Sequence, residues 1–140
     1  MSLGHIALTA VVAFVAYFVF GGVVFMGVPA LKREFEKHSN LYRPQEELMK
    51  VMPLGMVATF IAIFVLTHLY AMVHWHGSPL ERGLIFGAMI GVFFDCVFVM
   101  HNYVNLRVSA KLSIQQAVAY FFEWLVVCVV MALVYGTPGA

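Results

Sequence analysis

Four long apolar runs dominate this chain and restrict it to a narrow set of folds. They cover about residues 6–31, 51–75, 83–106 and 114–135, so each is about 22–26 residues long. A helix rises about 1.5 Å per residue, and each run can therefore cross a hydrocarbon core about 30 Å thick. Lipid cannot satisfy an exposed backbone, so runs of this kind are expected to be helices. The sequence predicts an all-α integral membrane protein, a four-helix transmembrane bundle forming a single domain over residues 1–140.

The composition points the same way. Hydrophobic residues make up 63% of the chain and charged residues 11%, whereas a soluble domain carries roughly 25% charged residues. The net charge of +1 argues neither for nor against nucleic acid, but the lack of a basic patch with interleaved aromatic residues predicts that nucleic acid is not a partner. The first run has no basic region before it and no clean cleavage site after it, which favours a retained helix over a signal peptide. The lipid bilayer is therefore the first expected partner.

Lysine and arginine are distributed unevenly between the connections. Residues 32–50 contain five of them and residues 107–113 contain two, whereas the rest of the chain offers only Arg82. The positive-inside rule predicts that both of these loops are cytoplasmic and that both termini lie on the outer side. The expected arrangement is thus an antiparallel up-down bundle, in a bacterial inner (plasma) membrane.

The connections differ in kind. Residues 32–39 continue a helical pattern beyond the first run, and Pro44 followed by acidic residues is typical of a new helix start. Segment 32–50 is therefore expected to form a short cytoplasmic hairpin, either a solvated charged loop or a docking surface for a partner. The short connections 76–82 and 107–113 predict that the second, third and fourth spans are adjacent neighbours.

A stripe of glycines marks one face of the third span. Gly83, Gly87 and Gly91 recur every four residues, which places them on one side of a helix. Small residues at this spacing let another helix approach closely in a membrane. The stripe indicates a helix contact, either inside the bundle or at the seam of a homodimer.

Two carboxylates are predicted to lie within the membrane at similar depth. Asp95 follows the glycine stripe with Asn102 seven residues later, while Glu123 lies near the middle of the last span with Gln116 and Tyr120 before it. A carboxylate at the bilayer centre costs at least about 2.5 kcal/mol and usually has a function. Three interpretations stay open: hydrogen-bonded structural residues, a proton or cation relay, or a polar pocket for a small molecule or metal.

The histidines give weaker indications of a site. His68 and His101 are expected at opposite depths, so they can join the intramembrane polar set but are poorly placed to ligate one haem iron. His5, His74 and His76 are expected at the outer face, where they could bind copper or zinc or simply lie at the interface. No CxxC or HExxH motif supports a metal site, and whether the protein holds haem or a metal stays open.

The chain resembles a broad group of small uncharacterised bacterial four-span integral membrane proteins. The resemblance rests on the Met52-Pro53-Leu54-Gly55-Met56 start of the second span, the glycine-rich opening of the third, and the later polar residues. It implies the four-span fold and carries no activity with it.

Three functions are compatible with this pattern. The first is a structural or accessory subunit, or a ligand-holding scaffold, of a membrane complex. The second is a minimal ion- or proton-coupled transporter or channel that uses the carboxylate pair. The third is a haem- or metal-binding membrane oxidoreductase. Because no nucleophile elbow, P-loop or dinucleotide motif is present, an enzyme is not favoured. A homo-oligomer, or a partner protein from a membrane complex, is expected.

Overall fold

The computed structural model describes residues 2–136, which form helices joined by short connections and contain no strand. Four helical segments are long and apolar enough to cross a membrane: α1 (Leu3–Gly27), α3 (Gln45–Met72), α4 with its continuation (Pro79–Asn105) and α6 (Ala110–Tyr135). The all-helical fold and the four apolar spans predicted from the sequence are confirmed.

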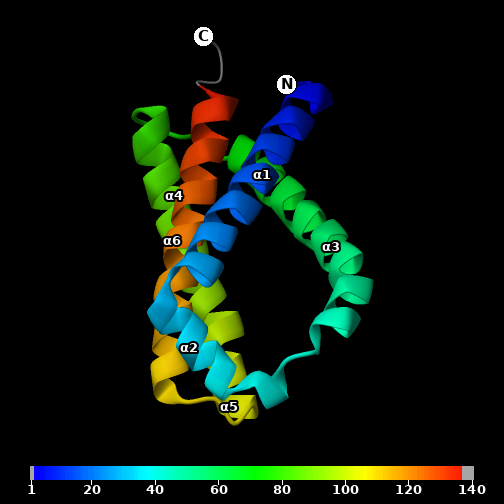
Figure 1. Ribbon diagram of the computed structural model, residues 1–140. Coiled ribbons are helices and arrows are strands. Elements are labelled where there is room, and N and C mark those ends of the chain that lie inside the picture. Colours follow the sequence, from blue (N-terminus) through cyan, green and yellow to red (C-terminus); the bar gives the residue numbers. More distant parts are fainter. Residues whose placement is uncertain (1, 137–140) are drawn as a thin grey trace.

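The long helices run in alternating directions, and the start of α1 and the end of α6 lie at the same end of the molecule (Figure 1). Helices α4 and α6 form the most closely packed pair, α1 crosses α6, and α3 packs on α1. The main apolar core lies where these helices meet, and it includes the buried residues Ala10, Ile63, Phe86, Trp124, Val127 and Met131.

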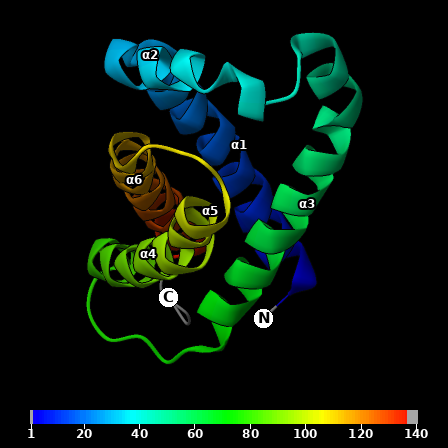
Figure 2. The same cartoon turned by 90° about the horizontal axis from the view of Figure 1, so that it is seen from below.

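The segment after α1 differs from the predicted hairpin. Helix α1 ends at Gly27, the backbone is extended at Val28, and Pro29 opens a separate short helix, α2 (Pro29–Lys37). The residue before a proline is disfavoured in the helical region, which explains why the first run does not continue straight to residue 31. Helix α2 packs against α6, and the turn η1 (Ser39–Leu41) then leads away to α3 (Figure 2).

Helix α3 leans away from the other helices over its first half. Every residue from 45 to 58 is exposed, and only 6% of its apolar window is buried, compared with 39% for α6. Near its end it approaches α4 through Tyr70 and Phe86, whose ring centroids are 5.4 Å apart. The expected adjacency of the second and third spans therefore holds only beside the loop that joins them.

The two ends of the molecule differ in charge. One end, called the basic end below, is formed by α2, η1, the start of α3, and the connection between α5 (Met100–Asn105) and α6. It carries seven of the eight lysines and arginines, and the eighth, Arg82, lies in the first turn of α4 at the opposite end. The uneven distribution of lysine and arginine along the sequence thus becomes a difference in charge between the two ends of the folded molecule.

Candidate functional site

The glycine stripe faces α6 within the same chain. A Cβ atom added at Gly83 would lie 2.7 Å from the Cα of Val129, and one at Gly87 would lie 2.8 Å from the Cα of Leu125. A Cβ at Gly91 would meet the ring of Phe121 at 2.8 Å. These close approaches fix the register of the two antiparallel helices, and the next step of four residues brings Asp95 level with Ala117.

Asp95 lies where the α-helix widens. Helix α4 ends at Phe94, and residues Asp95–Val99 form a π-helical turn, η2, in which the N–H of Met100 donates to the carbonyl of Asp95. Single π turns inside helices are rare and are frequent at functional sites. The wider turn also rotates the residues that follow, so the seven-residue spacing no longer places Asn102 on the face of Asp95. Nothing in the residue pattern announced this turn.

A groove of about 430 Å³ opens beside the π turn. We call it the Asp95 groove, and its walls come from η2, α5 and the first half of α6: Asp95, Cys96, Val99, Met100, Tyr103, Ala110, Ser113, Ile114 and Ala117. Carbon atoms form nearly all of its surface. Asp95 is partly buried, and its Oδ1 atom is fully buried without a hydrogen-bond partner among the described residues. The groove therefore has apolar walls, and one of its lining residues, Asp95, keeps a carboxylate oxygen buried without a partner among the described residues.

Glu123 occupies a different environment, at the contact between α6 and α1. Its side chain is 1% exposed, and its Oε2 atom has no partner among the described residues. Oε1 lies against Gly21, where any Cβ atom would collide with it. The ring of Tyr17 packs on Trp124, the residue beside Glu123, at 5.5 Å. Gly21 thus makes the space that lets a carboxyl group be buried between two spans.

The two carboxylates do not face one another. Ala117, which is level with Asp95, precedes Glu123 by six residues, or about 9 Å along the helix axis. The same six residues turn about 240°, so the two positions point about 120° apart around α6. By this register the two positions are offset by about 9 Å along the axis of α6, because the glycine contacts set how far α4 and α6 are displaced relative to one another.

The other members of the predicted polar set are scattered. The amide of Gln116 donates to the hydroxyl of Tyr42 at 3.4 Å, near the basic end. Tyr120 packs between Phe25 and Phe94, with ring distances of 5.0 Å to each. Asn102 is half-buried in α5. These residues support contacts between helices, and none of them hydrogen-bonds to the unpartnered oxygen of Asp95 or of Glu123 in the described chain.

The histidines do not come together as ligands. His68 and His101 are exposed, and His68 lies beside the ring of Phe64. The Nε2 atom of His5 lies 3.0 Å from the carbonyl of Tyr135, which ties the start of α1 to the end of α6. His74 and His76 are exposed in the loop before α4. Among residues 2–136 no group of three histidine, cysteine or acidic side chains lies close enough together to hold a metal ion.

A charged cluster at the basic end was not anticipated. Glu34, 4% exposed on α2, accepts hydrogen bonds at Oε1 from Lys37 at 2.7 Å and from Lys111 at 2.9 Å. These hydrogen bonds hold the pKa of Glu34 near 2, below its usual value of 4.5. The spacing of Glu34 and Lys37 was visible in the sequence as a helical pair, but the partnership with Lys111 depends on how α2 folds back.

His38 joins the same two segments. The N–H of Ser109 donates to its Nε2 at 3.3 Å, and its Nδ1 lies 2.9 Å from the carbonyl of Glu34. A carbonyl can only accept, so Nδ1 is the donor to Glu34 and Nε2 is the acceptor from Ser109. Helix α2 is therefore fastened to the start of α6 by Glu34 and His38 together.

Arg82 was also missed as a structural residue. Its side chain is 1% exposed, and its Nε donates to the carbonyl of Ser78 at 3.2 Å. Its Nη2 atom and the hydroxyl of Tyr70 are both buried without a hydrogen-bond partner in the described chain. A cation in a loop of a membrane protein is normally read as an orientation signal, and that reading gave no reason to expect burial.

Comparison of the chain with protein-family models, with curated proteins and with solved structures finds no match. The fold and the composition define an α-helical protein with four spans suited to a lipid bilayer.

Proposed function

We propose that the protein is an accessory scaffold of a membrane complex and that it holds a mainly apolar ligand in the Asp95 groove. The observation that carries the proposal is the pairing of a groove of about 430 Å³ with one buried carboxylate oxygen that has no partner. Small-molecule sites commonly measure about 300–1,000 Å³ and combine apolar walls with a few polar groups. The groove has both properties.

The chemistry of the walls defines the ligand class. Apolar walls favour a hydrocarbon body, and the free oxygen of Asp95 favours one hydrogen-bond donor, either an amine cation or a hydroxyl group. A buried acceptor without a partner costs about 1–3 kcal/mol, so a donor that reaches this oxygen when the Asp95 side chain turns toward the groove gains this amount in addition to its apolar contacts. The π turn sets the backbone position from which Asp95 reaches the groove.

The proposal includes an orientation. The basic end is placed in the cytoplasm, with the first and third connections, and both termini on the outer side of a bacterial inner membrane. The support is the bias of seven basic residues against one between the two ends. The exposed first half of α3 supports assembly with another membrane protein, because the other helices of this chain bury only 6% of its apolar window.

Native mass spectrometry after mild extraction tests the proposal. We expect a small-molecule adduct on the wild-type protein, reduced occupancy in Asp95→Asn, and none in Asp95→Leu. Asparagine keeps an acceptor and loses the charge, whereas leucine removes both. Glu123→Gln is the matched control, because it changes a buried carboxyl group outside the groove and should keep the adduct. An adduct that survives Asp95→Leu, or a wild-type protein without any, would contradict a ligand in this groove.

Ion- or proton-coupled transport is the second candidate, favoured by one observation. Asp95 and Glu123 each keep a buried oxygen without a partner in the part of the chain that the structure describes. Because they point to different sides of α6, a relay between them needs water or a conformational change. Proton-coupled uptake in vesicles that is lost in both Asp95→Asn and Glu123→Gln would establish this candidate, and unchanged uptake in both would refute it.

A further inference from the structure

A second cavity system lies on a neighbouring face of α6, between α6 and the α1–α2 segment, and shares Ile114 with the Asp95 groove. Its upper part is a groove of about 380 Å³ with apolar walls that include Val24, Leu31, Val118 and Phe122. Its lower part is a cavity of about 290 Å³ lined by Arg33, Glu34, Lys37 and Lys111. Ala30 lines both, so the two spaces meet at this residue.

We propose that this system binds one anionic phospholipid from the leaflet at the basic end, with its phosphate among the cations and an acyl chain in the apolar groove. Three cations and one carboxylate line the lower cavity, which leaves a local charge of +2. Basic pockets between membrane helices bind anionic headgroups by the same charge complementarity.

The cations retain the capacity to bind a phosphate. Lys37 and Lys111 each use one of three ammonium donors on Glu34, and their side chains are 64% and 67% exposed. Arg33 donates through Nε to the carbonyl of Pro29 at 3.2 Å, and its planar terminal nitrogens suit a phosphate. Glu34 holds the two lysines side by side, so it positions them for an anion while neutralising only one charge.

The geometry of α6 fits a lipid better than a free phosphate. Lys111, Gln115, Val118 and Phe122 follow one another at helical spacing from the charged cavity into the apolar groove. From Lys111 to Phe122 is eleven residues, or about 16 Å, which is half of a hydrocarbon core about 30 Å thick. A soluble phosphate would use the lower cavity alone, whereas a lipid of one leaflet would use both.

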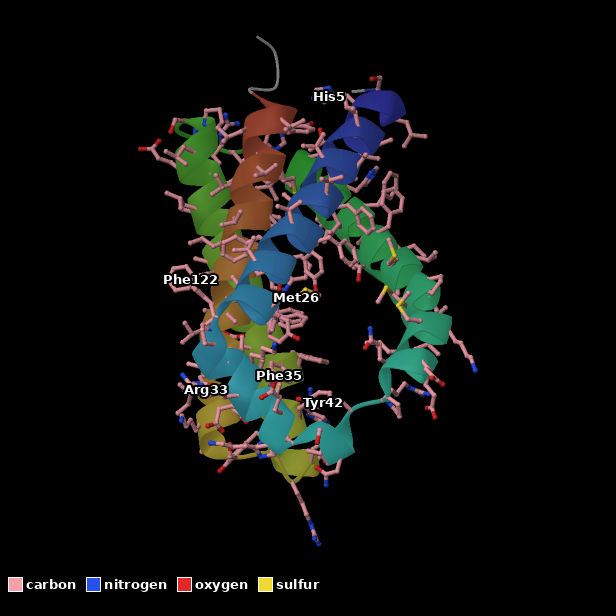
Figure 3. The ribbon with its side chains drawn as sticks, viewed as in Figure 1. His5, Met26, Arg33, Phe35, Tyr42 and Phe122 are labelled. Atoms are coloured by element: carbon pink, nitrogen blue, oxygen red, sulfur yellow. The ribbon has the colours of Figure 1, made fainter. Side chains whose placement is uncertain are left out.

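The stick view shows how the two parts share one edge of the molecule. Arg33 and Phe122 both project from the left edge in Figure 3, whereas Tyr42 lies toward α3. The apolar groove at this edge shares Ile114 with the Asp95 groove, whose other walls include α5 and η2. The charged cavity has no lining residue in common with the Asp95 groove, so variants of its cations test the lipid site without replacing a residue of that groove.

Lipid titration of the delipidated protein in detergent, followed by native mass spectrometry, tests the inference. Phosphatidylglycerol is compared with phosphatidylcholine of the same chains, and we expect one phosphatidylglycerol to bind at least tenfold more tightly. The double variant Arg33→Gln, Lys111→Gln should weaken this binding by about thirtyfold, since each basic residue at an anionic surface contributes about a factor of five. The matched variant Arg43→Gln, Lys50→Gln removes two charges from the same end outside the cavity and should change binding less than twofold.

Two further experiments separate binding of the lipid headgroup from binding of the acyl chain. Ala30→Trp fills the junction without changing a charge, and it should abolish binding of phosphatidylglycerol. Glycerol 3-phosphate should compete only weakly, because it has no chain for the apolar groove. Equal binding of phosphatidylcholine, equal losses in both double variants, or competition by glycerol 3-phosphate as strong as by the lipid would each overturn the proposal. Circular dichroism and thermal midpoints confirm that every variant is folded.

Discussion

Replacement of Gly87 by alanine tests how closely α4 and α6 are packed. The added Cβ atom would lie 2.8 Å from the Cα of Leu125 and 3.1 Å from both the carbonyl oxygen of Leu125 and the Cβ of Cys128. Carbon atoms are most stable about 3.5–4.0 Å apart, so the helices must separate by several tenths of an ångström. Two of the three atoms belong to the backbone and cannot move aside as a side chain would.

The expected loss follows from two opposing terms. Overpacking of a well-packed contact typically costs 1–3 kcal/mol. Alanine also favours the helix over glycine by roughly 0.5–1 kcal/mol. We therefore expect Gly87→Ala to lower the free energy of unfolding by about 1–2 kcal/mol, and Gly87→Val, with two more carbon atoms, to lower it further.

The assay is reversible unfolding in mixed micelles titrated with sodium dodecyl sulfate, followed by far-ultraviolet circular dichroism. Gly22→Ala is the matched control, because Gly22 lies within α1 and a Cβ there meets no atom within 4 Å. It should leave stability unchanged or raise it slightly. If Gly87→Ala is as stable as Gly22→Ala, the close approach of α4 to α6 is wrong, and with it the register that separates Asp95 from Glu123.

Three further predictions follow from other contacts. Gly21→Ala should destabilise the protein less than Gly87→Ala, because only the carboxyl end of Glu123 must move. In a double-mutant cycle measured by the same titration, most of the stability lost through Gly21→Ala should disappear when Glu123 is already alanine. The pKa of Glu34 is held near 2 against a usual 4.5, so its contribution to stability should be full well above pH 4.5 and fall with the pH, disappearing only below the folded-state pKa near 2. The difference between the thermal midpoints of wild type and Glu34→Gln measures this contribution, and a difference that does not shrink between neutral pH and about pH 2 would refute it. A lipophilic maleimide should label Cys96, which is exposed in the Asp95 groove, and leave the buried Cys128 unmodified, as mass spectrometry of tryptic peptides would show.

The spans could be predicted because length and hydropathy suffice to identify a membrane helix. The lateral arrangement could not, because lipid is as apolar as a leucine side chain and an apolar helix face does not reveal whether it meets protein or lipid. Helix α3 shows this limit: residues 51–58 contain no polar or charged side chain, yet all of them are exposed. Only small and polar residues carried information about contacts, as at Gly83 and Glu123, both of which are buried.

The candidate site was partly visible for the same reason. Asp95 and Glu123 stood out because charge at this depth is costly, and the sequence could state that each lies inside a span. Their relation depends on the register of α4 against α6 and on the π turn at Asp95, neither of which a residue pattern encodes. The cluster of Glu34 and Lys111 was hidden because its members lie 77 residues apart and meet only when the break at Pro29 turns α2 onto α6.

The break at Pro29 has a consequence for both proposed sites. If α1 continued as one straight helix, Glu34 would be carried away from α6, and Lys37 and Lys111 would have no shared acceptor. Because Pro29 opens a second helix after the extended Val28, α2 turns toward α6 and closes the lower cavity. The same fastening holds the start of α6, whose first turns form one wall of the Asp95 groove. The contacts of Glu34 and His38 with the residues before and within α6 therefore support two grooves on different faces of one helix, and loss of these contacts should loosen both.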